Sequence, residues 1–409
     1  MPSGTTLGLT IHVYCGTNAR GLTGPRLAEE VARRYALQVE YGGADRHVHR
    51  ITPAVSVLVV TYQHASFIAE CLDGILAQQT DFPFEVIIGE DGSDDGTREI
   101  CIAYADAHPD RIRLFLRDRA LTQLPLDPDG IVPIKRLNGR FTRQAARADV
   151  LAFCEGDDCW TDPTKLQRQY DVLQDDPRAA AVIHRVTVTW PTDEQDPWQY
   201  ALPARSRLTT EDVIWDRGTP TCAVMVRNVG LEHPDYLDWS CQTLSVDYLV
   251  RAVASFYGDT HVIDRGMAVH RKHPGGISQS ALYRDRIRLA ESTRNLYLGI
   301  RALSPPDRRR VLYPKLAGVS GKLALAELAD RRIAHAVRHG AEAIAFAFSA
   351  PGELVRQRHR WWDPLVTTLR RRQPAQPGTT SGSMDFSPTV PARTAKVSSE
   401  TSSPRAHRT

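Results

Sequence analysis

The chain has 409 residues, a formal net charge of +3, 42% hydrophobic residues and 24% charged residues. This length accommodates one large α/β domain and a smaller appendage, and the composition is ordinary for a soluble globular protein. The seven cysteines include no Cys-x-x-Cys pair, which indicates isolated thiols in a reducing compartment. Neither a run of roughly 18 apolar residues nor a signal-peptide pattern occurs, so we expect a cytoplasmic location, and we expect no nucleic-acid partner.

Residues 1–50 predict a small β-α-β extension. The runs 9–15 and 37–41 favour two strands, and the segment 25–35 favours a helix that a proline opens. The sequence does not decide whether this extension joins the main sheet.

Two strongly apolar segments, 55–61 and 84–89, each precede a segment with helical spacing of apolar residues, 67–79 and 97–107. This succession of strand, helix, strand and helix predicts an α/β fold with a doubly wound, mostly parallel sheet and helices on both faces. Ligands bind at the carboxyl ends of the strands in such sheets. The loops that follow the strands are therefore expected at one ligand-binding edge.

A third strand, predicted over 150–154, ends in the run Glu-Gly-Asp-Asp (155–158). Carboxylates this close repel one another, so we expect a cation to offset their charge. Oxygen ligands at a strand end, beside a glycine that lets a ligand approach the backbone, suit Mg²⁺ or Mn²⁺. The alternative is an acidic turn before the next helix, which accounts for Asp162 as a helix cap but not for the acids directly after the strand.

Three segments resemble the successive motifs of family 2 glycosyltransferases of the GT-A fold: Val-Val-Thr-Tyr (59–62), Glu-Asp-Gly-Ser-Asp-Asp-Gly-Thr (90–97) and Phe-Cys-Glu-Gly-Asp-Asp-Cys-Trp (153–160). The similarity covers about residues 53–280, and three motifs in order are far more specific than any one of them. The resemblance implies a nucleotide-diphospho-sugar transferase that depends on Mn²⁺ or Mg²⁺ and inverts the anomeric centre.

The resemblance also implies roles for single residues. Tyr62 would stack on the donor base, Asp91 would bind the base or its ribose, and Asp157 would be the direct metal ligand. The other residues expected at the donor after the first and third strands are Thr61, Glu155 and Asp158. Glu155 stands where the family commonly has aspartate, and its longer side chain is expected to reach the ribose or metal only through water. The alternatives are that Tyr62 packs on the next helix and that Asp91 belongs only to a turn.

The segment 118–147 is basic and is interrupted by proline and glycine. A loop longer than about 12 to 15 residues is often functional, and here we expect a lid over the anionic diphosphate. Arg140 is the residue singled out to bind the diphosphate, because a guanidinium suits paired phosphate oxygens. Solvated surface charge is the alternative for this segment.

A second group of candidate residues lies downstream. Asp247 begins a segment whose apolar residues share a helical face, so it is either a helix cap or, as the resemblance implies, the catalytic base that faces the acceptor. The segment 267–276 resembles the family's aromatic-Arg-x-His element, with His270 in the aromatic position. His273 would then complete the metal shell or touch the diphosphate, and a surface histidine in a basic loop is the alternative.

Beyond residue 280 the chain predicts a helical module, with helices over 283–302, 307–329 and 332–348. Arginines alternate with tryptophans and leucines in 353–372, which favours peripheral contact with an anionic membrane surface, whereas packing of these rings onto the module is the alternative. The tail is rich in Pro, Ser and Thr and is expected to be disordered. The predicted domains are 1–50, 51–280 (glycosyltransferase), 281–372 (helical module) and 373–409 (tail).

These features predict a metal-dependent, inverting glycosyltransferase that moves a sugar from a nucleoside-diphosphate sugar to an acceptor hydroxyl, as in the synthesis of cell-envelope or other glycans. The acceptor classes expected are a glycan, a lipid-linked molecule or a small molecule. A nucleotidyltransferase is one alternative, although the loop 63–66 is not the glycine- and lysine-rich loop expected of it. A catalytically inactive nucleotide-sugar-binding or scaffold protein is another. A dinucleotide dehydrogenase is disfavoured because no Gly-x-Gly-x-x-Gly follows the first strong strand.

Overall fold

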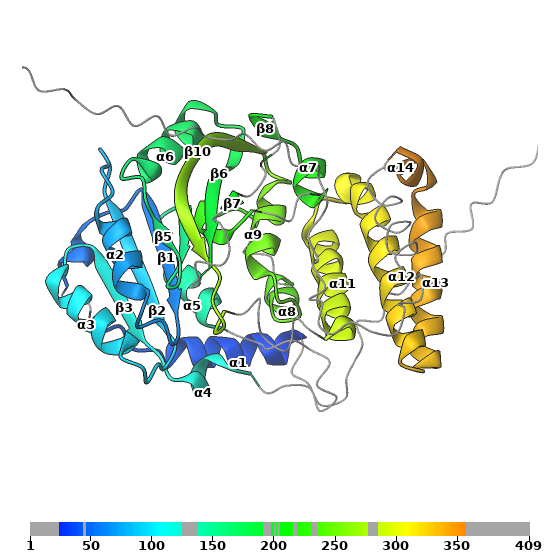
Figure 1. Ribbon diagram of the computed structural model, residues 1–409, viewed down its shortest axis with the longest axis horizontal. Coiled ribbons are helices and arrows are strands. Elements are labelled where there is room, and N and C mark those ends of the chain that lie inside the picture. Colours follow the sequence, from blue (N-terminus) through cyan, green and yellow to red (C-terminus); the bar gives the residue numbers. More distant parts are fainter. Residues whose placement is uncertain are drawn as a thin grey trace, which may run out of the picture. The chain divides into compact units, whose positions relative to one another are not determined.

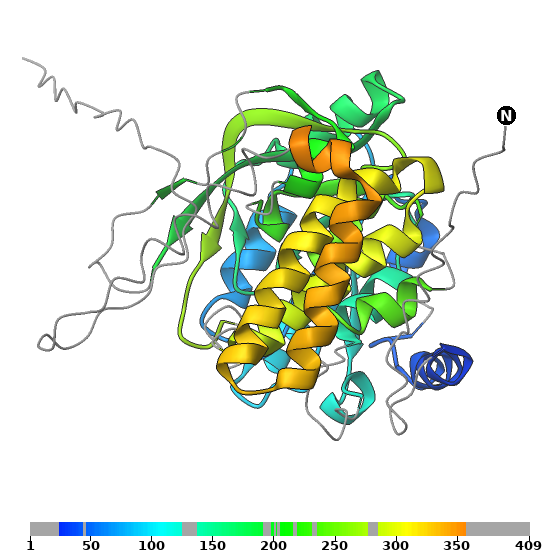
Figure 2. The same ribbon diagram turned by 90° about the vertical axis from the view of Figure 1, so that its right-hand side faces the viewer.

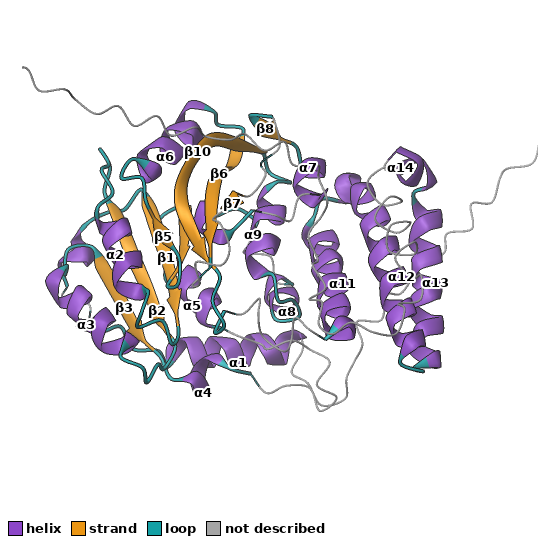
Figure 3. Cartoon of the chain, in the orientation of Figure 1, coloured by secondary structure: helices purple, strands orange, loops and turns teal. Residues whose placement is uncertain are grey.

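The computed structural model describes residues 24–43, 46–124, 137–190, 198–199, 202, 205–215, 219–230, 235–276 and 285–356. Within these residues the strands form one ten-stranded sheet in the order β3-β2-β1-β4-β9-β6-β10-β5, with β7 paired to β6 and β8 paired to β10 (Figures 1 and 3). The strands are β1 (Val55–Thr61), β2 (Phe84–Glu90), β3 (Ile112–Leu116), β4 (Val150–Glu155), β5 (Cys159–Trp160), β6 (Ala179–Thr189), β7 (Trp198–Gln199), β8 (Arg207–Leu208), β9 (Met225–Arg227) and β10 (Asp259–Arg271).

The sheet is mostly parallel. The strands β3, β2, β1 and β4 run in one direction, and β6 runs parallel to β10. The short strand β9 is antiparallel to both β4 and β6, so it joins the two parallel parts of the sheet. Six of the seven residues of β1 are buried, as expected for a strand covered on both faces. The predicted fold class is confirmed.

The helices follow the strands in the order that the sequence predicts. Those of the sheet region are α1 (Gly24–Ala36), α2 (Ile68–Leu76), α3 (Thr97–Ala107), α4 (Arg119–Thr122), α5 (Asn138–Gln144), α6 (Lys165–Asp175), α7 (Thr210–Trp215), α8 (Tyr236–Ser240) and α9 (Val246–Ala254). The C-terminal helices are α11 (Arg286–Leu303), α12 (Tyr313–Ala329), α13 (Ile333–Ser349) and α14 (Pro351–Arg356). The 3-10 helices are η1 (His47–Arg50), η2 (Thr221–Ala223) and η4 (Pro306–Leu312).

Helices cover both faces of the sheet because side chains alternate along each strand. Val55, Val57 and Val59 of β1 point into a core that they share with α2, α3 and α6. Leu58 points the opposite way, into a second core that includes residues of α9, α11, α12 and α13. Figure 1 shows α2 and α3 on one side of the sheet and the C-terminal helices stacked beyond α9. Both faces are therefore buried, and the strand ends are left to carry function.

The three predicted C-terminal helices are confirmed as α11, α12 and α13. The helices α12 and α13 form an antiparallel hairpin, which Figure 2 shows from the side. No helix of the described ranges has both the length and the apolar character needed to cross a membrane. Of the segment 353–372, only 353–356 lie within the described part, so its membrane contact stays a prediction.

The N-terminal extension differs from its prediction in one segment. The helix expected over 25–35 is present as α1, whereas the run 9–15 lies outside the described residues. The strand expected over 37–41 is wrong: Glu40 makes only an isolated antiparallel bridge to Phe115. Side chains hold this segment instead, since the Glu40 carboxylate pairs with Arg113 at 2.8 Å while Val39 is 68% exposed. A strand that faces an apolar core would bury such a side chain.

Candidate donor and metal site

The carboxyl ends of β1, β2 and β4 meet at one edge of the sheet. In the parallel register Thr61 pairs with Glu90, and Val60 pairs with Glu155. The backbone pairing extends one residue beyond each strand. The Asp91 N–H donates to the Thr61 carbonyl at 3.1 Å, and the Gly156 N–H donates to the Val60 carbonyl at 2.9 Å. The loops that follow the three strands are thus held side by side.

Tyr62, Asp91 and Arg119 form a contiguous group at this edge, which we call the Tyr62 group. Asp91 is nearly buried, its Oδ2 lies 3.0 Å from Arg119 Nη1, and its Oδ1 accepts a hydrogen bond from the Thr122 hydroxyl. The Arg119 guanidinium also lies over the Tyr62 ring, with Cζ 3.6 Å from the ring centroid. A cation therefore bridges an aromatic face and a carboxylate. Arg119 was not among the predicted site residues, although its position shortly after β3, another parallel strand, makes it a candidate.

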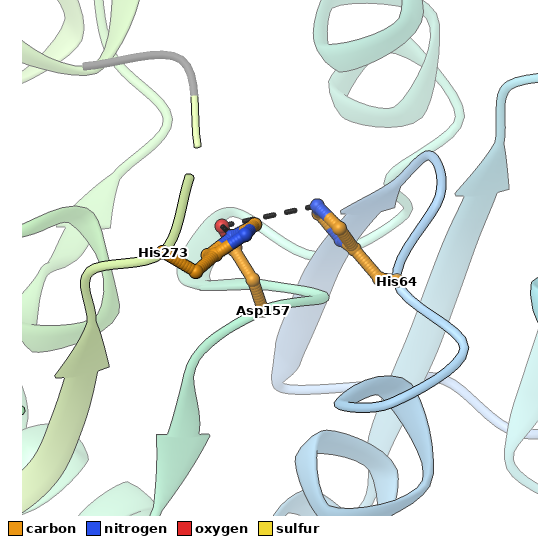
Figure 4. A group of neighbouring side chains, drawn as sticks. All are labelled: His64, Asp157 and His273. Carbon is orange, nitrogen blue, oxygen red and sulfur yellow. Dashed lines mark hydrogen bonds and ion pairs between the residues drawn. The ribbon is translucent and has the colours of Figure 1, made fainter. Parts of the chain in front are cut away.

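His64, Asp157 and His273 converge at the same edge, and we call them the His-Asp cluster. Figure 4 shows His64 in the loop after β1, Asp157 after β4 and His273 after β10. His273 Nε2 lies 3.0 Å from Asp157 Oδ2, and His64 Nε2 lies 3.8 Å from the same oxygen. One ligand atom from each residue lies within 4.8 Å of the other two. Asp157 and His273 were predicted as metal ligands, whereas His64, which stands three residues beyond β1, was not.

His64 is held in place by its other ring nitrogen. The Thr61 Oγ1 lies 3.2 Å from His64 Nδ1, which leaves Nε2 directed at the His-Asp cluster. A Cβ at position 156 would lie 2.6 Å from Thr61 Oγ1 and 2.9 Å from His64 Nδ1. Gly156 is therefore required for this close approach. A hydrogen bond on the far nitrogen of the imidazole is also how proteins orient metal-binding histidines.

The electrostatics of the site favour a bound cation. Burial lowers the pKa of His64, so its imidazole is neutral at pH 7 and can act as a ligand. Burial works to raise the pKa of Asp157. The hydrogen bond with His273, and then the charge that His64 carries at the low pH where this carboxyl group titrates, outweigh burial, so the pKa of Asp157 lies below its ordinary value. Burial, and then the charges of Asp157 and Asp158, raise the pKa of Glu155 well above its ordinary value.

The donor atoms of the His-Asp cluster fit a divalent metal. Two imidazole nitrogens and one carboxylate oxygen make up the set. Imidazole suits divalent transition metals, whereas Mg²⁺ prefers oxygen ligands and keeps several waters.

The Asp158 carboxylate faces β10. It is fully buried, its Oδ1 accepts from the Arg271 backbone N–H at 3.0 Å, and the same oxygen lies 3.1 Å from His270 Nδ1. Arg271 Nη1 in turn donates to the Asp157 carbonyl at 3.1 Å. These hydrogen bonds fix the acidic loop 155–158 to β10, and His273 follows two residues after the end of β10. Asp158 thereby positions the cluster, and its contact with the donor stays a prediction.

Asp247 lies in the first turn of α9 and is exposed. The Thr221 hydroxyl donates to Asp247 Oδ2 at 3.3 Å. Asp247 is also close enough to Glu155 for its charge to contribute to the raised pKa of that residue. The candidate base therefore faces the acidic strand end across the site, and its catalytic role stays a prediction.

The short helix η2, which carries Thr221, is fixed from below by polar side chains. Trp160 Nε1 donates to the Cys222 carbonyl at 3.1 Å, and Gln169 Nε2 donates to the Ala223 carbonyl at 2.9 Å. Trp160 directly follows the acidic loop. The hydrogen bond of Trp160 thus connects the acidic loop, which carries Asp157, to η2, which carries the Thr221 that contacts Asp247.

Arg140 lies in α5, where its guanidinium packs over the Tyr236 ring with Cζ 5.7 Å from the centroid. Burial, and then the neighbouring Arg143, lower the pKa of Arg140. Arg147, at the end of the same basic segment, pairs with Glu85 at 2.8 Å. The diphosphate contact and the lid remain predictions, and residues 125–136 of that segment lie outside the described ranges.

Acids and histidines lie at the carboxyl edge of a doubly wound, mostly parallel sheet, which is where such sheets bind ligands. The model of the glycosyl transferase family 2 matches residues 56–123, from β1 through the Tyr62 group. This part of the chain is therefore similar to family 2 glycosyltransferases, as the motifs at 59–62 and 90–97 predicted.

The relatives found by sequence are distant. An uncharacterized protein of Mycobacterium tuberculosis is 32% identical over 238 residues, which is 58% of this chain and 64% of that protein. An uncharacterized glycosyltransferase of Nostoc sp. is 26% identical over 235 residues, which is 56% of this chain and 67% of that protein. The matched region thus spans just under two thirds of the mycobacterial relative.

Two solved structures show a more remote likeness. TarS 1–349 of S. aureus in complex with UDP is 16% identical, with a TM-score of 0.44 over 71% of this chain and 88% of that chain. The mannosyltransferase PcManGT from Pyrobaculum calidifontis, in complex with GDP-Man and Mn²⁺, is 18% identical, with a TM-score of 0.42 over 85% and 95%.

Proposed function

We propose that the chain is a metal-dependent, inverting glycosyltransferase that moves a sugar from a nucleoside-diphosphate sugar to an acceptor hydroxyl. The observation that carries this proposal is the convergence of three chemically distinct groups at one sheet edge. They are the Tyr62 group, the His-Asp cluster and Asp247, contributed by β1, β2, β4, α4, α9 and the end of β10.

The Tyr62 group is suited to the nucleoside. An aromatic ring can stack on any base, and a carboxylate can accept hydrogen bonds from a base edge or from ribose hydroxyls. Asp91 is held by Arg119 and Thr122, so its oxygens are fixed before the nucleotide arrives. Because Arg119 occupies one face of Tyr62, the base would stack on the other face or displace the guanidinium.

The His-Asp cluster is suited to hold the cation that binds the diphosphate. His64, Asp157 and His273 would be the protein ligands, and Glu155 would contact the ion or the ribose through water. A bound divalent cation supplies stabilisation of the negative charge that develops on the diphosphate leaving group. The hydrogen bond from the β10 backbone to Asp158 keeps His273 within reach of Asp157. We propose Mn²⁺ in preference to Mg²⁺ on the basis of the two imidazoles.

Asp247 is suited to act as the general base. Its exposed carboxylate would accept the proton of the acceptor hydroxyl while the oxygen of that hydroxyl forms a bond to the anomeric carbon. The bond from the anomeric carbon to the diphosphate oxygen breaks at the same time, with attack from the opposite face, so the configuration inverts. The hydrogen bond from Thr221 fixes the orientation of the carboxylate.

The acceptor is proposed only by class, as a hydroxyl-bearing glycan, a lipid-linked molecule or a small molecule. Synthesis of cell-envelope or other glycans would use such acceptors. A cytoplasmic enzyme with peripheral contact at the inner face of a membrane would reach a lipid-linked acceptor.

A release assay tests the proposal without knowledge of the acceptor. Purified protein with Mn²⁺ is offered a panel of nucleotide sugars, and slow hydrolysis identifies the donor. Proton NMR of the first product formed reports the anomeric configuration, which should be opposite to that of the donor. The proposal is supported if the wild-type protein releases sugar from a donor and Asp157→Ala does not. Release from no donor, or release that is independent of metal, contradicts it.

A further inference from the structure

The backbone between Tyr62 and His64 turns through an uncommon conformation. Gln63, which separates them, has a φ of 58°, in the left-handed region that residues other than glycine seldom adopt. In an extended chain the side chains of residues 62 and 64 would point to the same side. The left-handed residue breaks this alternation, so that Tyr62 meets Arg119 while His64 Nε2 lies 3.8 Å from Asp157 Oδ2. The candidate nucleoside and metal sites therefore depend on one backbone turn.

The loop that follows β2 holds this turn through its side chains, and we call residues 93–97 the clamp. Three consecutive backbone N–H groups after β1 donate to side-chain oxygens of the clamp. The pairs are Gln63 with Ser93 at 3.0 Å, His64 with Thr97 at 2.8 Å and Ala65 with Asp95 at 3.0 Å. The Gln63 side-chain amide adds a further hydrogen bond to Asp94. Contacts of this number can maintain a backbone conformation that is otherwise unfavourable.

Thr97 makes the contact with His64 and is itself fully buried. Its hydroxyl donates to Asp95 Oδ1 at 2.6 Å, and the same carboxylate oxygen accepts the Thr97 backbone N–H at 3.0 Å. The hydroxyl proton is thus committed to Asp95, which leaves the lone pairs of Oγ1 for the His64 N–H. The His64 carbonyl is fixed as well, because it accepts the N–H groups of Phe67 and Ile68 at the start of α2. The point from which the imidazole extends is therefore set by Thr97 and by α2.

We infer that Thr97 is a positioning residue for the candidate metal site: it binds no metal itself but holds His64 where the imidazole can join Asp157 and His273. The inference rests on the proposed function, because it requires these three side chains to bind a divalent cation. His273 is held by its own hydrogen bond with Asp157 at 3.0 Å, whereas the 3.8 Å separation of His64 is too long for one. His64 therefore depends more on support from outside the cluster.

Electron paramagnetic resonance of free Mn²⁺ tests the inference on the full chain without any donor. Thr97→Val keeps the shape of the side chain but removes the hydroxyl, and it should weaken Mn²⁺ binding about tenfold or more, as loss of a contact that orients a metal ligand does. Thr97→Ser keeps the hydroxyl and should restore the wild-type affinity. Thr80→Val is the control, because it also removes a threonine hydroxyl, one that donates to the Phe82 carbonyl at 2.7 Å before β2 begins. This variant should bind Mn²⁺ as the wild type does.

A second spectroscopic measurement separates displacement of His64 from a general loosening of the fold. Electron spin-echo envelope modulation counts the imidazole nitrogens on bound Mn²⁺. The wild-type site should show two, from His64 and His273, and Thr97→Val should show only one. Two imidazoles on Mn²⁺ in Thr97→Val would overturn the inference, whatever the affinity of that variant.

The pair Gln63→Gly and Gln63→Val decides the question if Thr97→Val does not fold. Both variants lose the side-chain contact with Asp94, but glycine adopts the left-handed conformation readily, whereas β-branched valine does not. Gln63→Gly should therefore bind Mn²⁺ about tenfold more tightly than Gln63→Val. Equal affinities of these two variants, or wild-type affinity in a folded Thr97→Val, overturn the inference alone. A wild-type chain that binds no Mn²⁺ overturns both the inference and the proposed function.

Discussion

The imidazole Nε2 of His273 lies 3.0 Å from Oδ2 of Asp157, although the two residues are 116 positions apart in the chain. The contact links the loop after β4 to the loop after β10, and His64 approaches the same oxygen from the loop after β1. Three strand ends therefore supply a donor set of two imidazoles and one carboxylate. This relationship is the basis of the metal assignment and of the first prediction.

His64→Ala should weaken binding of Mn²⁺ about tenfold or more, because the variant loses one of three protein ligands. Asp157→Ala should abolish binding, since it removes the oxygen that both histidines approach. Electron paramagnetic resonance of free Mn²⁺ measures binding to the protein alone, independently of any activity. His108→Ala, which alters a histidine at the far end of α3, is the control. Equal affinity in wild-type protein and His64→Ala would limit the site to Asp157 and His273.

Asp247→Asn should lower the turnover of sugar transfer about 10²- to 10⁴-fold, the usual contribution of a general base. The substitution keeps the size of the side chain and an oxygen that can accept from Thr221 but removes the proton acceptor. Donor affinity, measured by calorimetry, should change little. Full transfer activity in this variant would exclude Asp247 as the catalytic base.

Arg119→Ala should weaken nucleotide binding about 10- to 100-fold, because the variant releases Asp91 from a charged hydrogen bond and uncovers Tyr62. Arg119→Lys should restore only part of the affinity, since an ammonium cannot bridge ring and carboxylate as a planar guanidinium does. Arg111→Ala is the control, because Arg111 packs on Phe84 at the opposite end of β2. Nucleotide affinity that is unchanged in Arg119→Ala would remove the Tyr62 group from the donor site.

Glu291 of α11 makes the stability of the fold depend on pH. Burial raises the pKa of Glu291 from its ordinary value of 4.5 to about 7. The folded state therefore binds the proton more tightly than the unfolded state, so this residue lowers the free energy of unfolding as pH rises from about 4.5 to 7. Glu291→Gln should match the wild type near pH 4.5 and exceed its stability at pH 8.

Urea unfolding at several pH values measures this effect, with the exposed Glu99→Gln as the control. The gain at pH 8 has an upper limit of about 3 kcal/mol, which is the free energy of the full pKa shift. A stability difference between Glu291→Gln and wild type that does not vary with pH would show that the carboxyl group titrates normally.

The sequence predicted which strands end at the functional edge, because apolar β-branched runs followed by polar loops are a local signal. That signal located Asp157 and Asp91 correctly at one edge. It could not show which side chains of the loops turn toward one another, since this depends on the distant end of β10. For that reason Asp158 was expected only as a donor-binding residue, and its hydrogen bond with the β10 backbone was not predicted.

His64 and Arg119 were missed for a related reason. His64 stands in a polar loop and Arg119 begins the short helix α4 in a basic segment, where such side chains are common. Each gains its role from a partner on another strand end. The strand that was wrongly predicted over 37–41 has a different cause. A strand was predicted there, but Glu40 and Gln38 bind Arg113 and Arg117 at the sheet edge, and the backbone forms only the bridge at Glu40.

Calorimetric titration with nucleoside diphosphates, in Mn²⁺ and then in EDTA, tests the central claim most directly. The account predicts that at least one of them binds in the presence of Mn²⁺ and loses most of its affinity in EDTA. Asp157→Ala should bind as weakly with Mn²⁺ as the wild-type protein does without it. Its melting temperature should change little, because the lost contact with His273 is offset by fewer carboxylates at the edge. Unchanged nucleotide affinity of Asp157→Ala in Mn²⁺, or binding of no nucleoside diphosphate at all, would contradict the account.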